Sequence, residues 1–530
     1  MDVLKIPFEE VPQLSSKDVA YATKNPQIKP FYKYEVSLEA FTEVIKDKAQ
    51  DHTDRNALAN ALEAQYKGLD TTEAVRKNIE RLRQKNTFTV TTAHQPGLFT
   101  GPLYYIFKII STINLAEQLN QQYPDHQFVP IFISGAEDHD FDEVNHARLF
   151  GKEIIWENEE KGGVGFMQTS SLSAALEQLK DILGDSEDAQ AAYQLIEEAY
   201  TSHEQYGRAT HHLVNSLFCD YGLVVVSMDD PTLKRLMIPH IKKEIFEQPS
   251  QELINETQQK LEDADFGEQA HARPINFFYL RDQLRARIVQ EGDDFAVIDT
   301  DYRWSKEELE AEIEEHPERF SPNVVMRPIY QETVLPNLAY IGGGGEISYW
   351  LERKSQFEHF GVNYPMLIRR NSALWVDRGA CKRMNKLGLE AKDLFDDTES
   401  LIKRFVADET ENELSLGKEK GQLNALFQAV AQKAAEIDPT LKKKTLAEGA
   451  KQLKALENLE GRLMRAEKQK HETAINQIRS LKDKLFPGNG LQERKENFLN
   501  FYLRYGNDFF AILKEHLHPL EEGFVVILDR

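Results

Sequence analysis

The chain has 530 residues, 41% of them hydrophobic and 28% charged, with a formal net charge of −23. These values indicate a folded protein of several structural units and argue against general nucleic-acid binding, because phosphates would be repelled. No apolar run reaches the roughly 18–20 residues of a membrane span, no signal-peptide core is present, and two cysteines provide no disulfide framework, which together favours a reducing cytoplasm.

The first informative segment is a predicted strand over Phe88–Thr92, a His-Gln-Pro-Gly turn, and a long apolar helix over Leu103–Leu119. A strand, a glycine turn and a helix can direct backbone N–H groups toward an anion, usually a phosphate. The candidate catalytic residues here are His94 and Gln95, and the candidate binding residues are Gly97, Thr100, Gly101 and Tyr104. An ordinary strand-to-helix turn is the alternative, because the spacing matches neither a P-loop nor the dinucleotide fingerprint.

A second candidate site follows the predicted strand Val129–Gly135. Residues 136–146 contain five carboxylates and two histidines, a density that suits Mg²⁺, zinc, or an ammonium or hydroxylated substrate. Zinc is the weaker prediction, since the two histidines are seven residues apart, and a solvated acidic helix start is the alternative. The candidate catalytic residues are Asp138, His139 and Asp140, and the candidate binding residues are Glu137, Asn145 and His146.

The middle of the chain alternates between predicted helices and strands. Helical periodicity covers residues 172–218, and Ser305 with Glu308 forms a capping box for a short acidic helix over 306–316. The further predicted strands are Gly222–Met228, Phe295–Asp299, Pro365–Arg369 and, near the C-terminus, Gly523–Leu528. Apolar runs without strict alternation indicate a sheet that is covered on both faces.

A third candidate site is the glycine-rich segment 339–350. Four consecutive glycines carry a cost in folding entropy, which predicts a need for backbone freedom, as in a nucleotide or substrate clamp. A flexible loop is the alternative, and the residues after the glycines are predicted to begin a helix. The candidate binding residues are Gly343, Gly345, Glu346, Tyr349 and Trp350.

Residues 412–486 have the periodicity of a helical arm. Leucine and alanine recur at spacings of three and four on both sides of a break at Asp438-Pro439, which predicts two helices joined by a short turn. Residues 439–486 contain 12 Lys+Arg against 6 Asp+Glu. We expect this arm to mediate dimerisation; packing on its own domain, or a basic face that binds nucleic acid or a second subunit, is the alternative.

The predicted architecture is α/β. It consists of a Rossmann-like core with a parallel sheet over 1–400, inserted segments at about 150–220 and 260–330, a protruding coiled-coil arm over 412–486, and a C-terminal segment over 487–530 that returns to the core. The three candidate sites are expected to meet in one cleft, since two of them directly follow predicted strands.

Four motifs occur in the order seen in one family: His-Gln-x-Gly-Leu-Phe-Thr-Gly-Pro-Leu-Tyr at 94–104, the acidic cluster at 137–146, Gly-Glu-Ile-Ser-Tyr-Trp at 345–350, and Gly-Leu-Gln-Glu-Arg at 490–494. Together they resemble the bacillithiol-biosynthesis cysteine-adding enzymes over nearly the whole chain. The resemblance implies a Rossmann-like core similar to that of class I aminoacyl-tRNA synthetases, a coiled-coil dimer, and an adenine nucleotide such as ATP as the activating partner.

The activity that this resemblance implies is the last step of bacillithiol synthesis, in which L-cysteine is joined through its carboxyl to the amine of glucosaminyl-malate. Direct condensation in water is slow and uphill, so an activated carboxyl is expected, with its anionic oxygens beside His94 and Gly97. The acidic residues at 137–142 would hold an ammonium group or deprotonate the attacking amine. Mg²⁺ is an optional partner, and neither nucleic acid nor membrane is expected. The alternatives are a non-catalytic adenine-nucleotide-binding or coiled-coil scaffold protein and a nucleotidyltransferase of the same fold.

Overall fold

The computed structural model describes residues 1–409 and 415–530. Contacts divide the chain into two compact units: a larger one of residues 3–374 and 492–527, and a smaller one of residues 1–2, 375–491 and 528–530. The predicted start of the arm, at residue 412, lies outside the described residues. Among the described residues, no helix combines the length and the apolar character needed to cross a bilayer.

The larger unit is built on a five-stranded parallel sheet with the strand order β13-β12-β2-β3-β6. Its strands are β2 (Thr87–His94), β3 (Gln127–Ser134), β6 (Val224–Ser227), β12 (Asn337–Gly342) and β13 (Met366–Arg369). The register pairs His94 with Ser134 and Ser134 with Ser227, so three strands end side by side. The predicted Rossmann-like parallel core is thereby confirmed.

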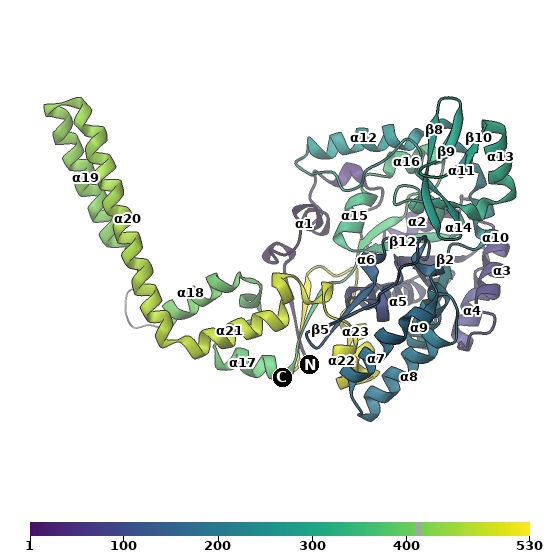
Figure 1. The fold of residues 1–530 in the computed structure, drawn as a ribbon, viewed down its shortest axis with the longest axis horizontal. Helices are drawn as coiled ribbons and strands as arrows, with labels where there is room; N and C mark the ends of the chain where they lie inside the picture. The colour runs from purple at the N-terminus through teal and green to yellow at the C-terminus, as the bar shows by residue number, and fades with distance from the viewer. Residues whose placement is uncertain (410–414) are drawn as a thin grey trace. The chain divides into compact units, whose positions relative to one another are not determined.

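Both faces of this sheet are buried, which explains the continuous apolar runs. Val129 and Ile131 of β3 belong to one hydrophobic cluster, whereas the preceding residue, Phe128, belongs to another. Side chains alternate between the two faces of a strand, so an apolar residue is required at nearly every position. The predicted apolar helix is α5 (Tyr104–Gln122), which packs on β2 and β3 (Figure 1).

Two expectations for the strands need correction. The segment before the glycines forms β12, which lies between β2 and β13, although we expected it to belong to a loop or clamp. The predicted strand Phe295–Asp299 is found as β9 (Asp294–Val297), but in a second, antiparallel sheet outside the parallel core. That sheet has the order β10-β9-β8-β7-β11, with β7 (Phe277–Arg281), β8 (Leu284–Glu291), β10 (Arg303–Trp304) and β11 (Phe320–Pro322).

The predicted helices of the larger unit are present. Residues 172–218 form α7 (Ser173–Leu183), α8 (Glu187–Thr201) and α9 (Tyr206–Phe218), and α13 (Lys306–Glu315) begins with the predicted Ser305 and Glu308 capping box. The other elements of this unit are α1 (Ser16–Ala22), α2 (Phe41–Lys48), α3 (Arg55–Gln65), α4 (Glu73–Arg81), α6 (Phe141–Val144), β4 (His146–Leu149), β5 (Lys152–Ile155), α10 (Pro231–Leu236), α11 (Ile238–Glu247), α12 (Pro249–Glu262), α14 (Arg327–Val334), α15 (Gly344–Trp350), α16 (Lys354–Phe360), α22 (Leu499–Tyr505) and α23 (Asp508–His516).

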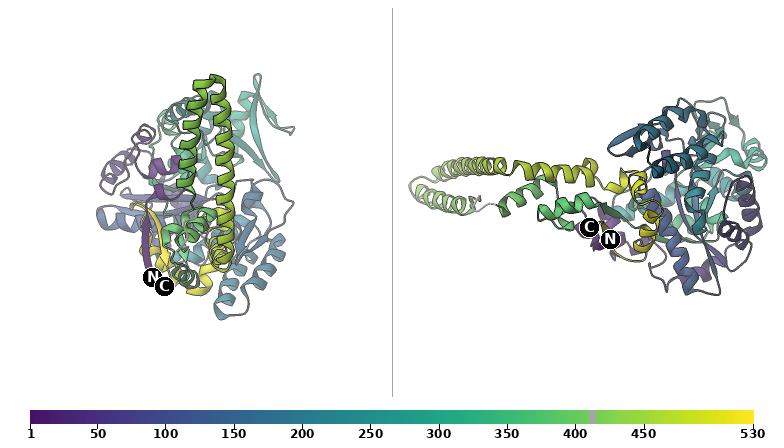
Figure 2. Two further views of the ribbon diagram at one scale, coloured as in Figure 1. Left: turned by 90° about the vertical axis from the view of Figure 1, so that its left-hand side faces the viewer. Right: turned by 90° about the horizontal axis from the view of Figure 1, so that it is seen from below.

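The smaller unit contains the predicted two-helix hairpin, made of α19 (Gly417–Ile437) and α20 (Pro439–Lys470), which run side by side in Figures 1 and 2. Lys420 pairs with Glu460 at 2.9 Å, as an antiparallel arrangement requires. A Cβ at Gly449 would come within 2.8 Å of the Phe427 side chain, so this glycine makes room for the ring. The remaining helices are α17 (Arg378–Lys386), α18 (Thr398–Asp408) and α21 (Glu472–Leu485).

A third sheet has the order β1-β15-β14 and joins strands from distant parts of the sequence. Its strands are β1 (Asp2–Ile6), β14 (Ala373–Val376) and β15 (Phe524–Leu528). The strand predicted at Gly523–Leu528 is therefore confirmed.

Candidate active site

A cavity of about 510 Å³ lies at the carboxyl edge of the central sheet. All five strands contribute to its wall at or just after their last residue: His94 at the end of β2, Ser134 at the end of β3, Met228 after β6, Gly343 after β12 and Arg370 after β13. Ligands of open α/β sheets bind at this edge, so the location itself favours a functional site.

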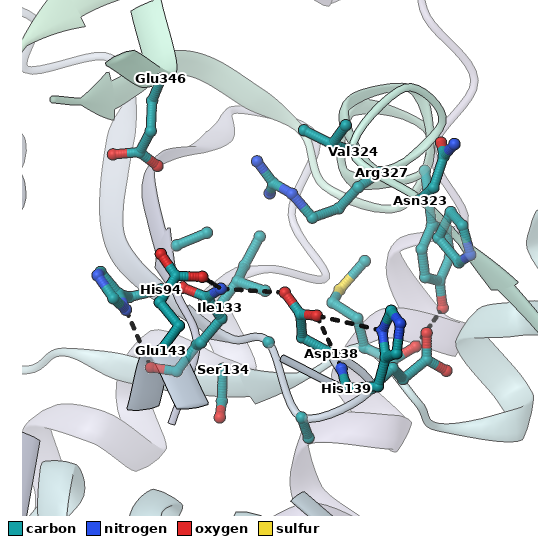
Figure 3. A pocket seen from close by; sticks show the side chains of 18 of the residues that line it. His94, Ile133, Ser134, Asp138, His139, Glu143, Asn323, Val324, Arg327 and Glu346 are labelled. Atoms are coloured by element: carbon teal, nitrogen blue, oxygen red, sulfur yellow. Dashed lines mark hydrogen bonds and ion pairs between the residues drawn. The ribbon is translucent and has the colours of Figure 1, made fainter. Parts of the chain in front are cut away.

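The three candidate sites meet in this cavity, as expected, because His94, Asp138 and Gly345 all line it. Figure 3 shows Asp138, His139 and Glu143 together, with Glu346 and Arg327 projecting from the other wall. The predicted residues that line the cavity are His94, Gln95, Tyr104, Glu137, Asp138, His139, Gly343, Gly345, Glu346 and Tyr349. Those outside the lining are Gly97, Thr100, Gly101, Asp140, Asn145, His146 and Trp350.

His94 is held between a backbone carbonyl and a phenol. Its Nδ1 lies 3.0 Å from the carbonyl oxygen of Gln95, and its Nε2 lies 3.0 Å from the hydroxyl of Tyr104. A carbonyl only accepts, so Nδ1 carries the proton and Nε2 accepts from Tyr104. Burial lowers the pKa of His94 to about 4, and the charge of Lys108 adds to the effect. The imidazole is therefore neutral at physiological pH and is a poor general base.

In the turn after His94, the backbone N–H groups that were predicted to bind an anion already have acceptors within the protein. The N–H groups of Gly97, Thr100 and Gly101 donate to carbonyls within residues 95–98, and that of Phe99 donates to the Tyr200 hydroxyl. Phe99 and Thr100 have positive φ values of 51° and 72°, a conformation that is costly for these side chains. The Asn497 amide fixes the turn by donating to the carbonyls of Phe99 and Gly101, both at 2.8 Å.

Gln95 joins two carboxylates of the acidic cluster. Its amide nitrogen donates to Asp138 Oδ2 at 3.0 Å and to Glu143 Oε2 at 2.8 Å. Burial opposes ionisation of Asp138, but hydrogen bonding with His139 and the charge of Arg285 outweigh it and hold the pKa of this carboxyl well below its usual range. Asp138 is therefore an anion that can bind a cation, and it is too weak a base to remove a proton.

The second, antiparallel sheet supplies the wall beside Asp138. Arg285 of β8 lies 4.0 Å above the centre of the Phe278 ring and donates to His139 Nδ1 at 2.5 Å. Its guanidinium approaches Asp138 at 4.0 Å. Glu137, on the same side, pairs with the buried Lys234 at 2.6 Å. The acidic cluster is thus partly neutralised by cations from other elements, as the sequence alone could not show.

Glu346, which follows the glycine run, is ionised within the wall. Burial opposes its charge, but the charge and hydrogen bonds of Lys108, with a hydrogen bond from Tyr340, lower its pKa to about 2. Trp350, four residues later, stacks on Tyr340 at 4.7 Å and is fully buried, so it belongs to the core.

The glycine run has no residue with positive φ, so the expected need for backbone freedom is wrong. Lack of space explains two of the four glycines: a Cβ at Gly344 would lie 2.2 Å from Asp18, and one at Gly342 would lie 3.0 Å from the Tyr340 ring. Gly345 differs, because a Cβ there would meet no protein atom within 4 Å. Since Gly345 lines the cavity, its missing side chain leaves room for a ligand.

Four arginines of the lining were not among the predicted site residues: Arg285, Arg327, Arg370 and Arg494. Two of them carried a usable signal. Arg370 directly follows a predicted strand, the same criterion that identified His94, and Arg494 ends the motif at 490–494. Arg285 and Arg327 reach the cavity through tertiary packing and had no such signal.

Among residues 1–409 and 415–530, no group of three or more His, Cys, Asp and Glu side chains is placed to hold a metal ion. His146, which we considered for zinc, starts β4, and its Nδ1 lies 3.2 Å from the amide oxygen of Asn145.

Comparison with known proteins identifies the family. The protein-family model of the N-terminal Rossmann-like domain of bacillithiol biosynthesis BshC matches residues 1–371. The family model of the C-terminal coiled-coil domain of BshC matches residues 373–528. Three relatives carry the name "Putative cysteine ligase BshC". The one from Flavobacterium johnsoniae is 41% identical over 96% of both chains, and the one from Christiangramia forsetii is 40% identical over 96% of this chain and 95% of the relative. The third, from Flavobacterium psychrophilum, is 39% identical over 98% of both chains. The chain therefore belongs to the bacillithiol biosynthesis BshC family.

Proposed function

We propose that this chain is a carbon–nitrogen ligase that joins the carboxyl of L-cysteine to the amine of glucosaminyl-malate in the last step of bacillithiol synthesis. The observation that carries the proposal is the distribution of charge in one cavity at the sheet edge. Asp138 and Glu143 lie on either side of the Gln95 amide, and Arg370 and Arg494 line the same cavity. Both substrates combine an amine with carboxylates, which suits such a site.

Asp138 and Glu143 provide the cation-binding part of the proposed site. An ammonium group that donates to both carboxylates would be held beside the Gln95 amide, which fixes their spacing. The low pKa of Asp138 keeps its charge constant over the physiological range, so its role is to bind and orient the amine.

His94 and Tyr104 would contact the reacting groups without exchanging protons at rest. Burial raises the pKa of Tyr104 to about 12, so the phenol keeps its proton and uses it in the hydrogen bond to His94 Nε2. The phenol oxygen can then accept a hydrogen bond from the attacking amine. The attacking amine, bound as an ammonium group, loses one proton to solvent before its nitrogen attacks the carbonyl carbon. When the C–N bond forms, the activating group leaves that carbon and the nitrogen loses a second proton to solvent.

Activation of the carboxyl by ATP or another adenine nucleotide remains part of the proposal. Such a nucleotide, when bound, would supply the free energy for amide formation. The turn at residues 97–101 does not fit the predicted phosphate cradle, because the N–H groups of Gly97, Phe99, Thr100 and Gly101 are already bonded within the protein. No step above depends on that turn.

Reconstitution with the purified chain tests the proposal. L-cysteine and glucosaminyl-malate are incubated with the protein, with and without ATP and Mg²⁺, and the amide is detected by mass spectrometry. We expect product with the complete mixture. No product under any condition, with both substrates shown to bind, would favour the scaffold alternative. Adenylate transfer without amide formation would favour a nucleotidyltransferase.

We further propose that the chain forms a homodimer through the hairpin of α19 and α20. Several large apolar side chains of this hairpin remain exposed, including Leu426 at 58% and Ile437 at 84%. Apolar residues in a coiled-coil pattern that stay exposed in one chain indicate a surface that is covered by another.

A further inference from the structure

Two arginines line the cavity beside Tyr104. Arg370 follows β13, and Arg494 ends the short turn Gln492–Arg494. The guanidinium carbon of Arg370 lies 5.2 Å from the centre of the Tyr104 ring. Both arginines line the same cavity as Tyr104, and their positive charges lower the pKa of this phenol, against the effect of burial. The cationic part of the cavity therefore adjoins His94 and Tyr104.

Arg370 is fixed in one orientation with a single nitrogen to spare. Its Nη1 donates to the Asn371 carbonyl at 2.8 Å and to Ser372 Oγ at 3.2 Å, and its Nη2 donates to Glu493 at 2.7 Å. Its Nε is buried and has no hydrogen-bond partner. A buried, unsatisfied guanidinium nitrogen is costly, so its presence in the wall of a cavity points to a ligand that completes the set.

Gly343 lies next to this nitrogen. A Cβ at Gly343 would lie 3.4 Å from Arg370 Nε. The backbone at Gly343 has φ −73° and ψ 168°, which any residue adopts, so the backbone does not require glycine here. Glycine at this position, which also lines the cavity, means that no residue-343 side chain lies against Arg370 Nε.

Arg494 adds an uncompensated charge. It is exposed and has no hydrogen-bond or ion-pair partner among the described residues. The neighbouring acid, Glu493, is buried and used by Arg370, so it does not neutralise Arg494. A free guanidinium presents a planar fork of donors that matches a carboxylate or a phosphate.

We propose that Arg370 Nε and Arg494 form an oxyanion subsite that binds a carboxylate of the malate part of the acceptor substrate. A phosphate of the activated donor is the other source of the same chemistry. The identity of the ligand rests on the proposed function, whereas the existence of the subsite does not. With the anion held at these arginines, an amine on the same molecule would extend toward Asp138 and Glu143, and the cavity would orient its substrate by charge.

A binding titration that needs no turnover tests the subsite. L-malate and inorganic phosphate are titrated separately by calorimetry onto the full-length protein, onto Arg494→Gln, and onto the matched control Lys495→Gln. Lys495 is an exposed cation next to Arg494 that does not line the cavity. Its substitution by glutamine removes the same charge as Arg494→Gln. We expect malate to bind the wild type and the control equally, and Arg494→Gln about tenfold or more weakly, as the loss of a charge-assisted hydrogen bond predicts.

The outcomes distinguish a malate carboxylate from a donor phosphate as the ligand, and both from the absence of a subsite. The same pattern with phosphate in place of malate would keep the subsite and assign it to the activated donor. Equal loss in both variants would mean that net charge alone is responsible, and it would overturn the subsite. So would the absence of binding by either probe to the wild type. If malate binding depends on Arg494 but the protein has no ligase activity, the proposed function is contradicted and the subsite is still supported.

Gly343→Ala provides a second variant without a change of charge. The added methyl would lie 3.4 Å from Arg370 Nε, where it would compete with a ligand atom, and its other neighbours lie at ordinary contact distances of 3.6 Å or more, so folding should be kept. We expect weaker binding of the same probe that Arg494→Gln loses. Unchanged binding by Gly343→Ala, with circular dichroism showing a folded protein, would remove Arg370 Nε from the subsite.

Discussion

At the scale of single residues, the Gln95 amide is the part of the site that organises its neighbours. By donating to both Asp138 and Glu143, it holds two anions near each other that would otherwise repel. An ammonium group placed between them would relieve the repulsion, and this favours binding over acid–base catalysis as the role of the cluster.

Asp138→Asn should lower kcat/KM for L-cysteine or for the acceptor amine by roughly 10- to 100-fold, because a hydrogen bond to a charged group is lost while the side chain keeps its size. Steady-state kinetics against each substrate in turn would identify which amine it binds. Asp142→Asn is the matched control, since Asp142 is an exposed acid of the same cluster that does not line the cavity. Equal effects of the two variants would contradict a specific role for Asp138.

His94 should make the stability of the protein depend on pH. Its pKa is lowered from 6.5 to about 4 by burial, so the unfolded chain binds a proton at pH values where the folded protein does not. The free energy of unfolding contributed by this group is therefore complete above about pH 6.5 and falls as the pH drops toward 4, by about 1–2 kcal/mol near pH 5.

Denaturant titrations of wild type and His94→Gln at several pH values measure this contribution. Glutamine keeps polar atoms at the site but does not titrate, so the variant should lose less stability between pH 7 and pH 5. His211 and His240, whose pKa values burial also lowers, remain in both proteins and cancel in the comparison. Parallel pH profiles of the two proteins would show that His94 is not buried in its neutral form.

At the scale of elements, the start of α15 separates structural from functional glycines. Gly344 has to be glycine because Asp18 of α1 occupies the space of its side chain, whereas no protein atom fills the space beside Gly345. Alanine is favoured over glycine in a helix by about 1 kcal/mol, so helix propensity does not explain a glycine at 345, whereas room for a ligand in the cavity would.

Gly345→Ala should therefore leave the free energy of unfolding unchanged or raise it, while kcat/KM falls because the methyl group enters the cavity. Thermal denaturation and steady-state kinetics of the same preparation measure both effects. Gly461→Ala, in the middle of α20, also meets no atom within 4 Å and should gain stability without loss of activity. Full activity of Gly345→Ala would show that the space is not used by a substrate.

The sequence predicted the strands of the parallel core except β12, and the physical reason is local pattern. The threonine- and valine-rich run of β2, the apolar runs of β3, β6 and β13, the long apolar segment of α5, and the capping box of α13 can all be recognised from neighbouring residues. β12 was missed because its apolar run is only the four residues Leu338–Ile341 and leads directly into the glycines, and only its place between two other strands makes it a strand.

The same distinction, between local sequence signals and tertiary packing, decides which site residues could be predicted. Residues at strand ends, such as His94 and Asp138, could be found because a parallel sheet brings its carboxyl ends together. Arg285, Lys108 and Lys234 could not, since each is brought to its carboxylate partner from an element distant in sequence. The neutral state of His94 is likewise a product of burial, which no local motif reveals.

At the scale of the whole molecule, the open question is how the hairpin of α19 and α20 covers its apolar surface. The repeated leucines predicted for α20, here called the leucine stripe, include Leu453, Leu456, Leu459 and Leu463. Leu453 and Leu456 are half-buried within one chain. Lysine at these positions would disturb the hairpin itself, so a change in association could not be separated from unfolding of the arm. Leu459 and Leu463, with 46% and 39% of their surface exposed, are better positions for a test.

The double variant Leu459→Lys, Leu463→Lys should sediment as a monomer at micromolar concentrations at which the wild type sediments as a dimer, because two charges would have to be buried on association. Ala455→Lys with Asn458→Lys is the matched control: it adds the same charge to exposed positions of α20 that lie outside the leucine stripe. Far-ultraviolet circular dichroism should show equal helix content in all three proteins. If the leucine variant remained a dimer, the exposed leucines of α20 would not be the contact, and a wild type that is monomeric at these concentrations would refute the proposed dimer altogether.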